Sequence, residues 1–139
     1  RCLSDWSSDV CSSDLREALR QKQAVLDNGK YSTIPHWVYR ELLPELAEKY
    51  DGLTARDCLT LYMYTHAYVN GQSENEAYLW AFPSVKQIRQ DTGIHGDRIK
   101  GLFDILVAEG VMITRKIPWH GHAKKMYMPL YERRLPDSH

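Results

Sequence analysis

The chain has 139 residues, 43% hydrophobic and 26% charged, which are ordinary values for one folded domain, and its formal net charge is zero. It has no apolar run of the roughly 20 residues that a membrane-spanning helix needs, and its first residues lack the apolar core of a signal peptide. The three cysteines are unevenly spaced, which fits neither a disulfide framework nor a metal site and indicates a reduced, cytoplasmic protein.

Residues 1–15 have neither the period of a helix nor the alternation of a strand, and they nearly repeat the string Ser-Ser-Asp. The whole segment resembles the translation of sequencing-library adapter DNA, which recurs at the ends of reading frames from metagenomic assemblies. The resemblance implies a disordered segment in which Cys2, Trp6 and Cys11 have no function, and a natural protein that is longer and begins differently. A natural Ser/Asp-rich tail is the alternative.

The next segments favour helices. Residues 16–30 read as a short charged helix or linker that ends at Asn28-Gly29. An extended stretch follows, and Pro35 suits the first position of another helix. From Trp37 the apolar residues recur at helical spacing, and Pro44 is expected to break or kink this helix.

The helix after residue 53 has the clearest local signals. Thr54 and Asp57 have the spacing of a capping box, in which each side chain accepts from the other residue's exposed amide. Apolar residues follow at steps of three and four, and Asn70-Gly71 is expected to end the helix. Cys58 lies on the apolar stripe, where a core thiol is favoured over a nucleophile because no partner base is indicated. Residues 78–82 then read as a short strand.

The sequence pattern of residues 84–110 predicts two helices joined by a tight turn. Ser84 has the position of an N-cap, Val85 is expected to face inward, and Gly93 can end the first helix in the left-handed conformation. The second helix is expected from about residue 95 or 96 to residue 109. Its buried face comprises Ile99, Leu102, Phe103 and Leu106.

A β-hairpin is expected after the two helices. Residues 111–117 and 125–131 are strand-like, and residues 118–123 form the turn between them. Because two strands alone are marginally stable, residues 78–82 are expected to join as a third strand. The sequence therefore predicts a mainly α fold with a small antiparallel β wing, which is a winged helix-turn-helix.

Two runs carry a family resemblance, LTARDCLTLYMYTHAYVNG at residues 53–71 and WAFPSVKQIRQDTGIHGDRIKGLFDILVAEGVM at residues 80–112. They resemble the winged helix-turn-helix domains of plasmid-type replication initiators and of related phage replication or regulatory proteins, over about residues 31–131. The resemblance implies sequence-specific binding of double-stranded DNA in replication initiation, or alternatively in transcriptional regulation. It leaves open a homodimer or contacts with replication or transcription proteins, and it leaves residues 132–139 as a tail. The chain departs from the family at His95, where Ser or Thr commonly opens the recognition helix.

The charge distribution favours a DNA partner for the second half of the chain. Residues 1–83 hold 8 basic and 12 acidic residues, a balance of −4, whereas residues 84–139 hold 10 and 6, a balance of +4. Because the start of a recognition helix enters the major groove, Arg98 and Lys100 are the candidates for base edges. Asp97 could accept from a cytosine, although complementing the helix dipole is favoured. The candidate DNA-binding residues are Ser84, Lys86, His95, Arg98, Lys100, Arg115, Lys116, His120, His122, Lys124 and Lys125.

Other functions have weaker signals. His120 and His122 could chelate a metal, but no third ligand is spaced nearby, so contact of the wing tip with DNA is favoured. No Gly-rich phosphate loop, nucleophile–base pair or carboxylate pair is recognisable, so we expect no enzyme, no cofactor and no small-molecule substrate. A winged helix that mediates protein contacts is the alternative, since the first half is acidic and Trp37 and Trp119 are expected to be exposed.

Overall fold

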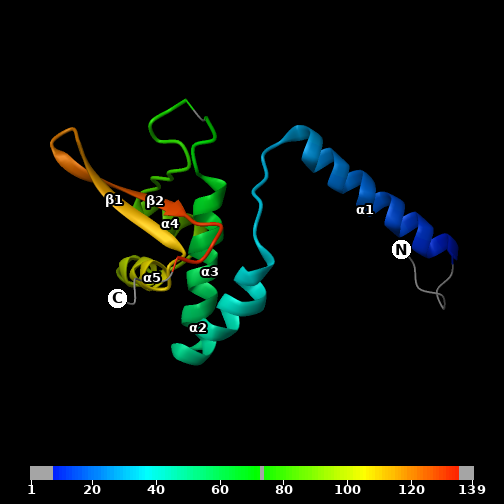
Figure 1. Cartoon of the computed structure of the whole chain (residues 1–139), viewed down its shortest axis with the longest axis horizontal. Helices are drawn as coiled ribbons and strands as arrows, with labels where there is room; N and C mark the ends of the chain where they lie inside the picture. Colours follow the sequence, from blue (N-terminus) through cyan, green and yellow to red (C-terminus); the bar gives the residue numbers. More distant parts are fainter. Residues whose placement is uncertain (1–7, 73, 135–139) are drawn as a thin grey trace. The chain divides into compact units, whose positions relative to one another are not determined.

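The computed structural model of the protein describes residues 8–72 and 74–134, and it is mainly helical with one two-stranded antiparallel sheet (Figure 1). The contacts divide the chain into two units, the first ending at Thr33 and the second beginning at Ile34. In chain order the elements are α1 (Ser8–Asn28), η1 (Val38–Leu42), α2 (Leu43–Lys49), α3 (Gly52–Ala67), α4 (Val85–Thr92), α5 (Gly96–Ala108), β1 (Met112–Trp119) and β2 (His122–Pro129).

In its described residues the first unit contains one helix, α1, which begins at Ser8 rather than near Arg16. The expectation that residues 8–15 lack regular structure is therefore wrong. The segment up to Asn28 contains neither Pro nor Gly, and the strong helix formers around Ala18 allow a helix to extend toward the N-terminus. Cys2, Trp6 and the side chain of Cys11 lie outside the described residues, as do residues 135–139. None of the described helices is long and apolar enough to cross a membrane.

Pro44 distorts its helix as the sequence predicted, but it does not break it. The Leu43 amide donates to the Val38 carbonyl, five residues back, so residues 38–42 form a π-helical turn that continues directly into α2. Pro44 has no N–H and cannot donate to a preceding carbonyl, which explains why the regular helical pattern fails at this point. Val38 and Leu42, at the two ends of this turn, are both fully buried in the core.

Helix α3 lies at the centre of the second unit and contacts α2, α5 and β2 (Figure 1). The predicted capping box is wrong, because α3 begins at Gly52 and its N-cap is Asp51, whose side chain accepts from the Thr54 amide at 2.7 Å. The helix ends at Ala67, before the expected stop at Asn70. Cys58 is fully buried, as predicted, and burial raises the pKa of its thiol to about 12.

Helices α4 and α5 form the predicted helix-turn-helix. Ser84 caps α4 by accepting from the Gln87 amide at 3.0 Å, and Gly93 ends it with a φ of +77°. The predicted apolar face of α5 is buried. Val85, however, is 49% exposed instead of inward-facing, because it occupies the first turn of α4, beside Gly96 and a surface groove.

The hairpin is longer and its turn tighter than expected. His120 and Gly121 alone form the turn, both with positive φ, and the strands therefore extend to the Trp119–His122 pair. Residues 78–82 do not form a third strand: only Ala81 pairs with the sheet, exchanging two 2.7 Å hydrogen bonds with Tyr127. Leu79 has a φ of +66°, which is incompatible with a continuous strand here.

Residues 130–134 form a strap across the core, although the sequence placed a tail from residue 132. The Tyr62 hydroxyl donates to the Leu130 carbonyl at 2.5 Å. The Trp37 indole donates to the Tyr131 carbonyl at 3.1 Å, so Trp37 is half-buried and not exposed as expected. Beyond this point Arg133 bonds Glu109 at 2.6 Å, and the Arg134 amide donates to the Gly110 carbonyl at 2.7 Å.

Glu109, at the end of α5, holds this strap electrostatically. Its carboxylate is only 8% exposed and pairs with Lys49 at 2.8 Å as well as with Arg133. Burial acts to raise the pKa of Glu109, but the hydrogen bonds and charges of Lys49 and Arg133 outweigh it and lower the pKa. Arg133 also bonds Glu45, so one guanidinium connects α2 with the end of α5.

Replacing Gly110 by Ala should destabilise the protein far more than the same change at Gly93. Both glycines have similar positive φ angles, +80° and +77°, so both substitutions introduce backbone strain of about 1 kcal/mol. A Cβ at Gly110 would also lie 2.0 Å from the Arg134 carbonyl oxygen, whereas nothing lies within 4 Å at Gly93. We expect a loss of about 3 kcal/mol for Gly110→Ala in urea unfolding. Equal losses for the two variants would show that the strap does not contribute.

The stability of the protein should fall between pH 6.5 and pH 4 because of His66. This side chain is 2% exposed and packs against Tyr62 and Tyr131, and burial lowers the pKa of His66 from 6.5 to about 4. Within this interval the unfolded chain binds a proton that the folded chain does not, so lowering the pH costs up to about 3 kcal/mol. His66→Phe should flatten the curve of unfolding free energy against pH. Parallel curves for the two proteins would contradict this assignment.

Candidate nucleic-acid interface

Helix α5 presents an exposed face that is slightly acidic, not basic, because it holds one lysine and two aspartates. Lys100 is 76% exposed and bonds Asp104 at 2.9 Å, one turn further along the helix. Asp97 is 94% exposed at the start of the same helix. His95 acts as the N-cap because its Nδ1 accepts from the Asp97 amide at 3.2 Å. The negative Asp97 lies in the first turn, where the helix dipole favours it.

Arg98 does not lie on the open face of α5 where the sequence placed it. Its guanidinium donates to Asp57 of α3 at 2.5 Å, and the two side chains are 38% and 17% exposed. Asp57 is available for this contact because Asp51 caps α3 in its place. The geometry therefore makes Arg98 a positioning residue that connects α5 to α3, and it leaves Lys100 as the cation of the outward face.

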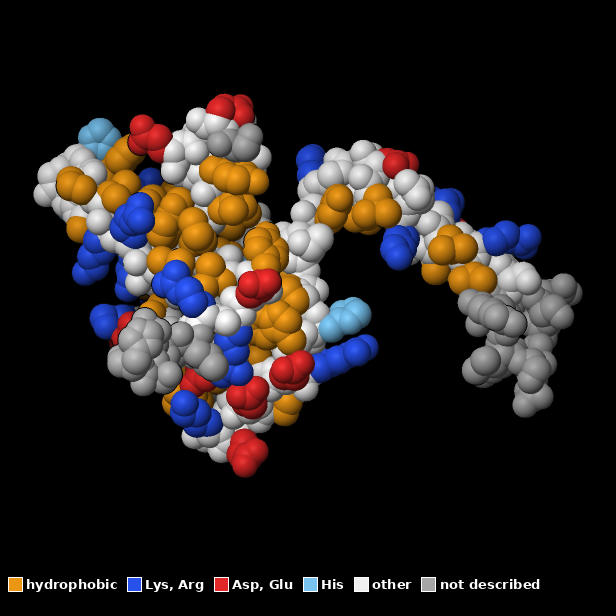
Figure 2. Space-filling model, viewed as in Figure 1, with side chains coloured by type: hydrophobic (Ala, Val, Ile, Leu, Met, Phe, Trp, Pro, Cys, Tyr) orange, Lys and Arg blue, Asp and Glu red, His pale blue; other side chains and the backbone are white. Residues whose placement is uncertain are grey.

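Positive charge is concentrated on α4 and on the hairpin instead. Lys86 and Arg89 are both exposed, three residues apart on α4, and so lie on the same side of that helix. Sequence reasoning missed Arg89, although its spacing from Lys86 was a usable signal. Figure 2 shows several Lys and Arg side chains on the side of the second unit that carries the hairpin and α5.

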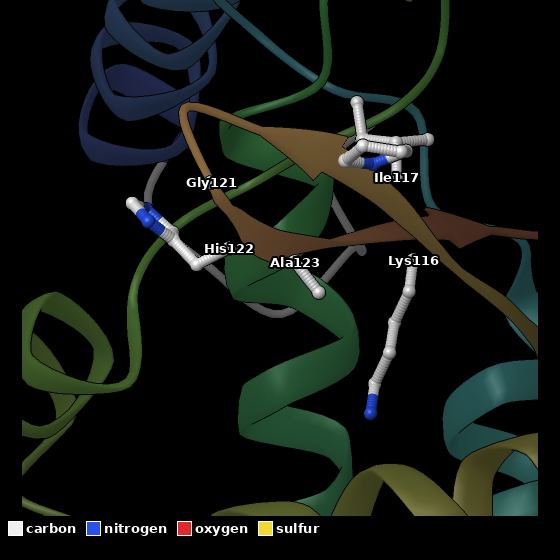
Figure 3. Close-up of a pocket in the computed structure, with 6 residues that line it drawn as sticks. Lys116, Ile117, Gly121, His122 and Ala123 are labelled. Carbon is white, nitrogen blue, oxygen red and sulfur yellow. The ribbon is translucent and has the colours of Figure 1, made fainter.

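The hairpin register divides the four wing cations between two faces. Lys116 pairs directly with Lys125, so both lie on one face of the sheet. Arg115 and Lys124 lie on the other face, where they cover aromatic rings. Figure 3 shows Lys116 and Ile117 pointing to opposite sides of β1, as the strand alternation requires. The wing therefore presents two pairs of cations and not one continuous row.

Two surface grooves adjoin the wing. The first, of about 450 Å³, lies at the tip between Lys116 and His122 (Figure 3). The second, of about 350 Å³, lies between the start of α4 and β2. This second groove brings together four of the residues predicted separately from the sequence, and we call it the α4–wing groove. They are Ser84, His122, Lys124 and Lys125.

The remaining predicted residues lie outside that groove. Lys86 is exposed near the start of α4, and His95 and Lys100 lie on α5. His120 is in the hairpin turn, where its ring packs edge-on against Trp119 at 4.7 Å. In the described part of the chain, no three His, Cys, Asp or Glu side chains gather in a way that could hold a metal ion.

A double-mutant cycle should detect the Arg98–Asp57 pair. Because Asp57 is largely buried, we expect a coupling of about 1 kcal/mol, above the value for exposed pairs. The exposed Lys100–Asp104 pair is the matched control, with an expected coupling of about 0.3 kcal/mol. Urea unfolding of each single Ala variant and of each double variant gives both values. Additive losses for Arg98→Ala and Asp57→Ala would contradict the positioning role of Arg98.

Comparisons with protein-family models, with curated proteins and with solved structures find no match for this chain. A proposal about function must therefore start from features seen in the structure itself. They are the helix-turn-helix of α4 and α5, the hairpin that follows, and the groove that places hairpin cations beside the start of α4.

Proposed function

We propose that the second unit is a sequence-specific binding domain for double-stranded DNA. The observation that carries this proposal is the α4–wing groove, where the N-terminus of α4 lies beside Lys124 and Lys125. Free amides at a helix start and nearby ammonium groups both favour phosphate oxygens. Helix α5 adjoins α4 through a tight turn, so a duplex whose backbone contacts α4 and the wing would place its major groove against α5.

Each group then has a defined role in this arrangement. Lys100 contacts base edges from the outward face of α5, while Arg98 fixes the angle of that helix through Asp57. Lys86 and Arg89 of α4 and Lys124 and Lys125 of the wing contact phosphates. His95 serves mainly as the N-cap of α5, a role that Ser or Thr would fill in the family that the sequence resembles.

The biological role that we propose is initiation of plasmid or phage replication, in the cytoplasm, where the DNA is. A transcriptional regulator built on the same module would use the same contacts, and so it remains the alternative. A winged helix that mediates protein contacts is the second alternative. It is favoured by one observation, the 46% exposure of Trp119 at the wing tip.

Duplex binding measured against salt concentration tests the proposal. About 4–6 phosphate contacts predict a slope of log K on log salt near −4 to −5. Lys86→Gln and Lys125→Gln should each reduce the magnitude of the slope by about 1, because each removes one phosphate contact. Arg40→Gln is the matched control, since Arg40 is an exposed cation of η1.

Base reading is tested separately with a set of duplexes of different sequence. Lys100→Ala should reduce the spread of affinities among them, whereas Lys125→Gln should weaken all of them alike. A slope near zero, or no duplex binding at low salt, would exclude the proposal and favour the protein-contact alternative.

A further inference from the structure

The outer face of the wing carries an open cluster of two aromatic rings and a lysine. The Lys124 ammonium lies 4.0 Å from the centroid of the Phe82 ring and 4.4 Å from the centroid of the Trp119 ring. Phe82 is 41% exposed and Trp119 is 46% exposed. The three residues come from the segment before α4, from β1 and from β2, and all three line the α4–wing groove.

A second aromatic–cation contact on the same part of the protein is closed. Arg115 lies 4.8 Å from the centroid of Trp80, and Trp80 is only 6% exposed. Trp80 is therefore part of the core packing, and the guanidinium of Arg115 covers its ring. Phe82 and Trp119 stay exposed to solvent although Lys124 lies against both rings, so core packing does not explain their exposed ring area.

A DNA duplex offers little surface that can stack on these exposed rings. The bases of a duplex are stacked on one another, and they offer only their edges to a protein in the grooves. An unpaired base, by contrast, exposes both of its π-faces and stacks on aromatic side chains whatever its sequence. The same groove contains His122 and Lys125, whose nitrogen atoms can contact the phosphates on either side of such a base.

We propose that Phe82, Trp119 and Lys124 form a binding site for single-stranded DNA. An unpaired base stacks on the two rings, and the flexible stem of Lys124 lets its ammonium move from the rings to an adjacent phosphate. This inference does not require duplex binding, because it depends on ring faces that a duplex leaves unused. It adds a second ligand, unpaired DNA, to the one proposed for α4 and α5.

The test compares one labelled oligonucleotide of roughly 12 nucleotides, single-stranded and annealed to its complement, by fluorescence anisotropy with the full chain. Trp119→Ala should weaken single-strand binding about tenfold, since one stacked base is lost, and change duplex binding by less than about threefold. Trp119→Phe should retain most of the single-strand affinity, because it keeps an aromatic face.

Tyr50→Ala is the matched control. Tyr50 is also an exposed aromatic residue beside a lysine, 39% exposed with Lys49 at 5.8 Å, but it follows α2, outside the groove. Its loss should leave both affinities unchanged. Because Trp119 is at the hairpin tip, thermal unfolding of Trp119→Ala should stay close to the parent, and Phe82→Leu provides a second variant at the same site.

The outcomes separate this inference from the proposed function. Duplex binding without single-strand binding, or equal losses of both in Trp119→Ala, would overturn the single-strand site alone. Single-strand binding that depends on Trp119, without duplex binding, would support the site and exclude the duplex proposal. A preference of tenfold or more for an oligoribonucleotide of the same sequence would contradict the assignment to DNA.

Discussion

Tyr127 fixes the geometry on which the candidate interface depends. Its ring is 3% exposed and stacks on Phe103 of α5, with the centroids 4.0 Å apart and the planes 20° apart. Its backbone exchanges both hydrogen bonds with Ala81, three residues before the N-cap of α4. One residue of β2 therefore connects the wing both to α5 and to the segment before α4. A two-stranded hairpin is marginally stable alone, so these contacts help to hold the wing in a defined position.

Features set by neighbouring residues could be predicted from the sequence, and features set by distant residues could not. Ser84 and Gly93 delimit α4 through local capping, and the buried face of α5 follows from its period, so both were predictable. The first residue of α3, by contrast, could not be predicted. Asp51 and Thr54 are both residue types that cap helices and lie three residues apart, and Asp57 is committed to Arg98, which is 41 residues away. The single bridge at Ala81 likewise depends on a distant partner.

The same contrast between features set by neighbouring residues and features set by distant residues holds for the candidate site. Charge counts placed the cations on the second half of the chain, but the hairpin register decides which of them share a face. The two-residue turn sets that register and separates the Lys116–Lys125 pair from Arg115 and Lys124. The sequence could not reveal that Phe82 meets Lys124, because they lie 42 positions apart and the Ala81–Tyr127 pairing beside them links two distant segments.

The position of Lys124 links the two proposed ligands. This ammonium can lie over the rings of Phe82 and Trp119 or contact a phosphate, but it cannot do both at once. A duplex that draws Lys124 to its backbone uncovers the rings, and an unpaired base that occupies the rings displaces Lys124 toward a phosphate. Both proposed ligands would also use Lys125, which lines the same groove. Duplex and single strand should therefore exclude each other from the wing, although Lys100 and α5 stay accessible to a duplex. A DNA segment with a junction between paired and unpaired regions would satisfy both proposed surfaces together, with its duplex on α5 and its first unpaired base on Trp119.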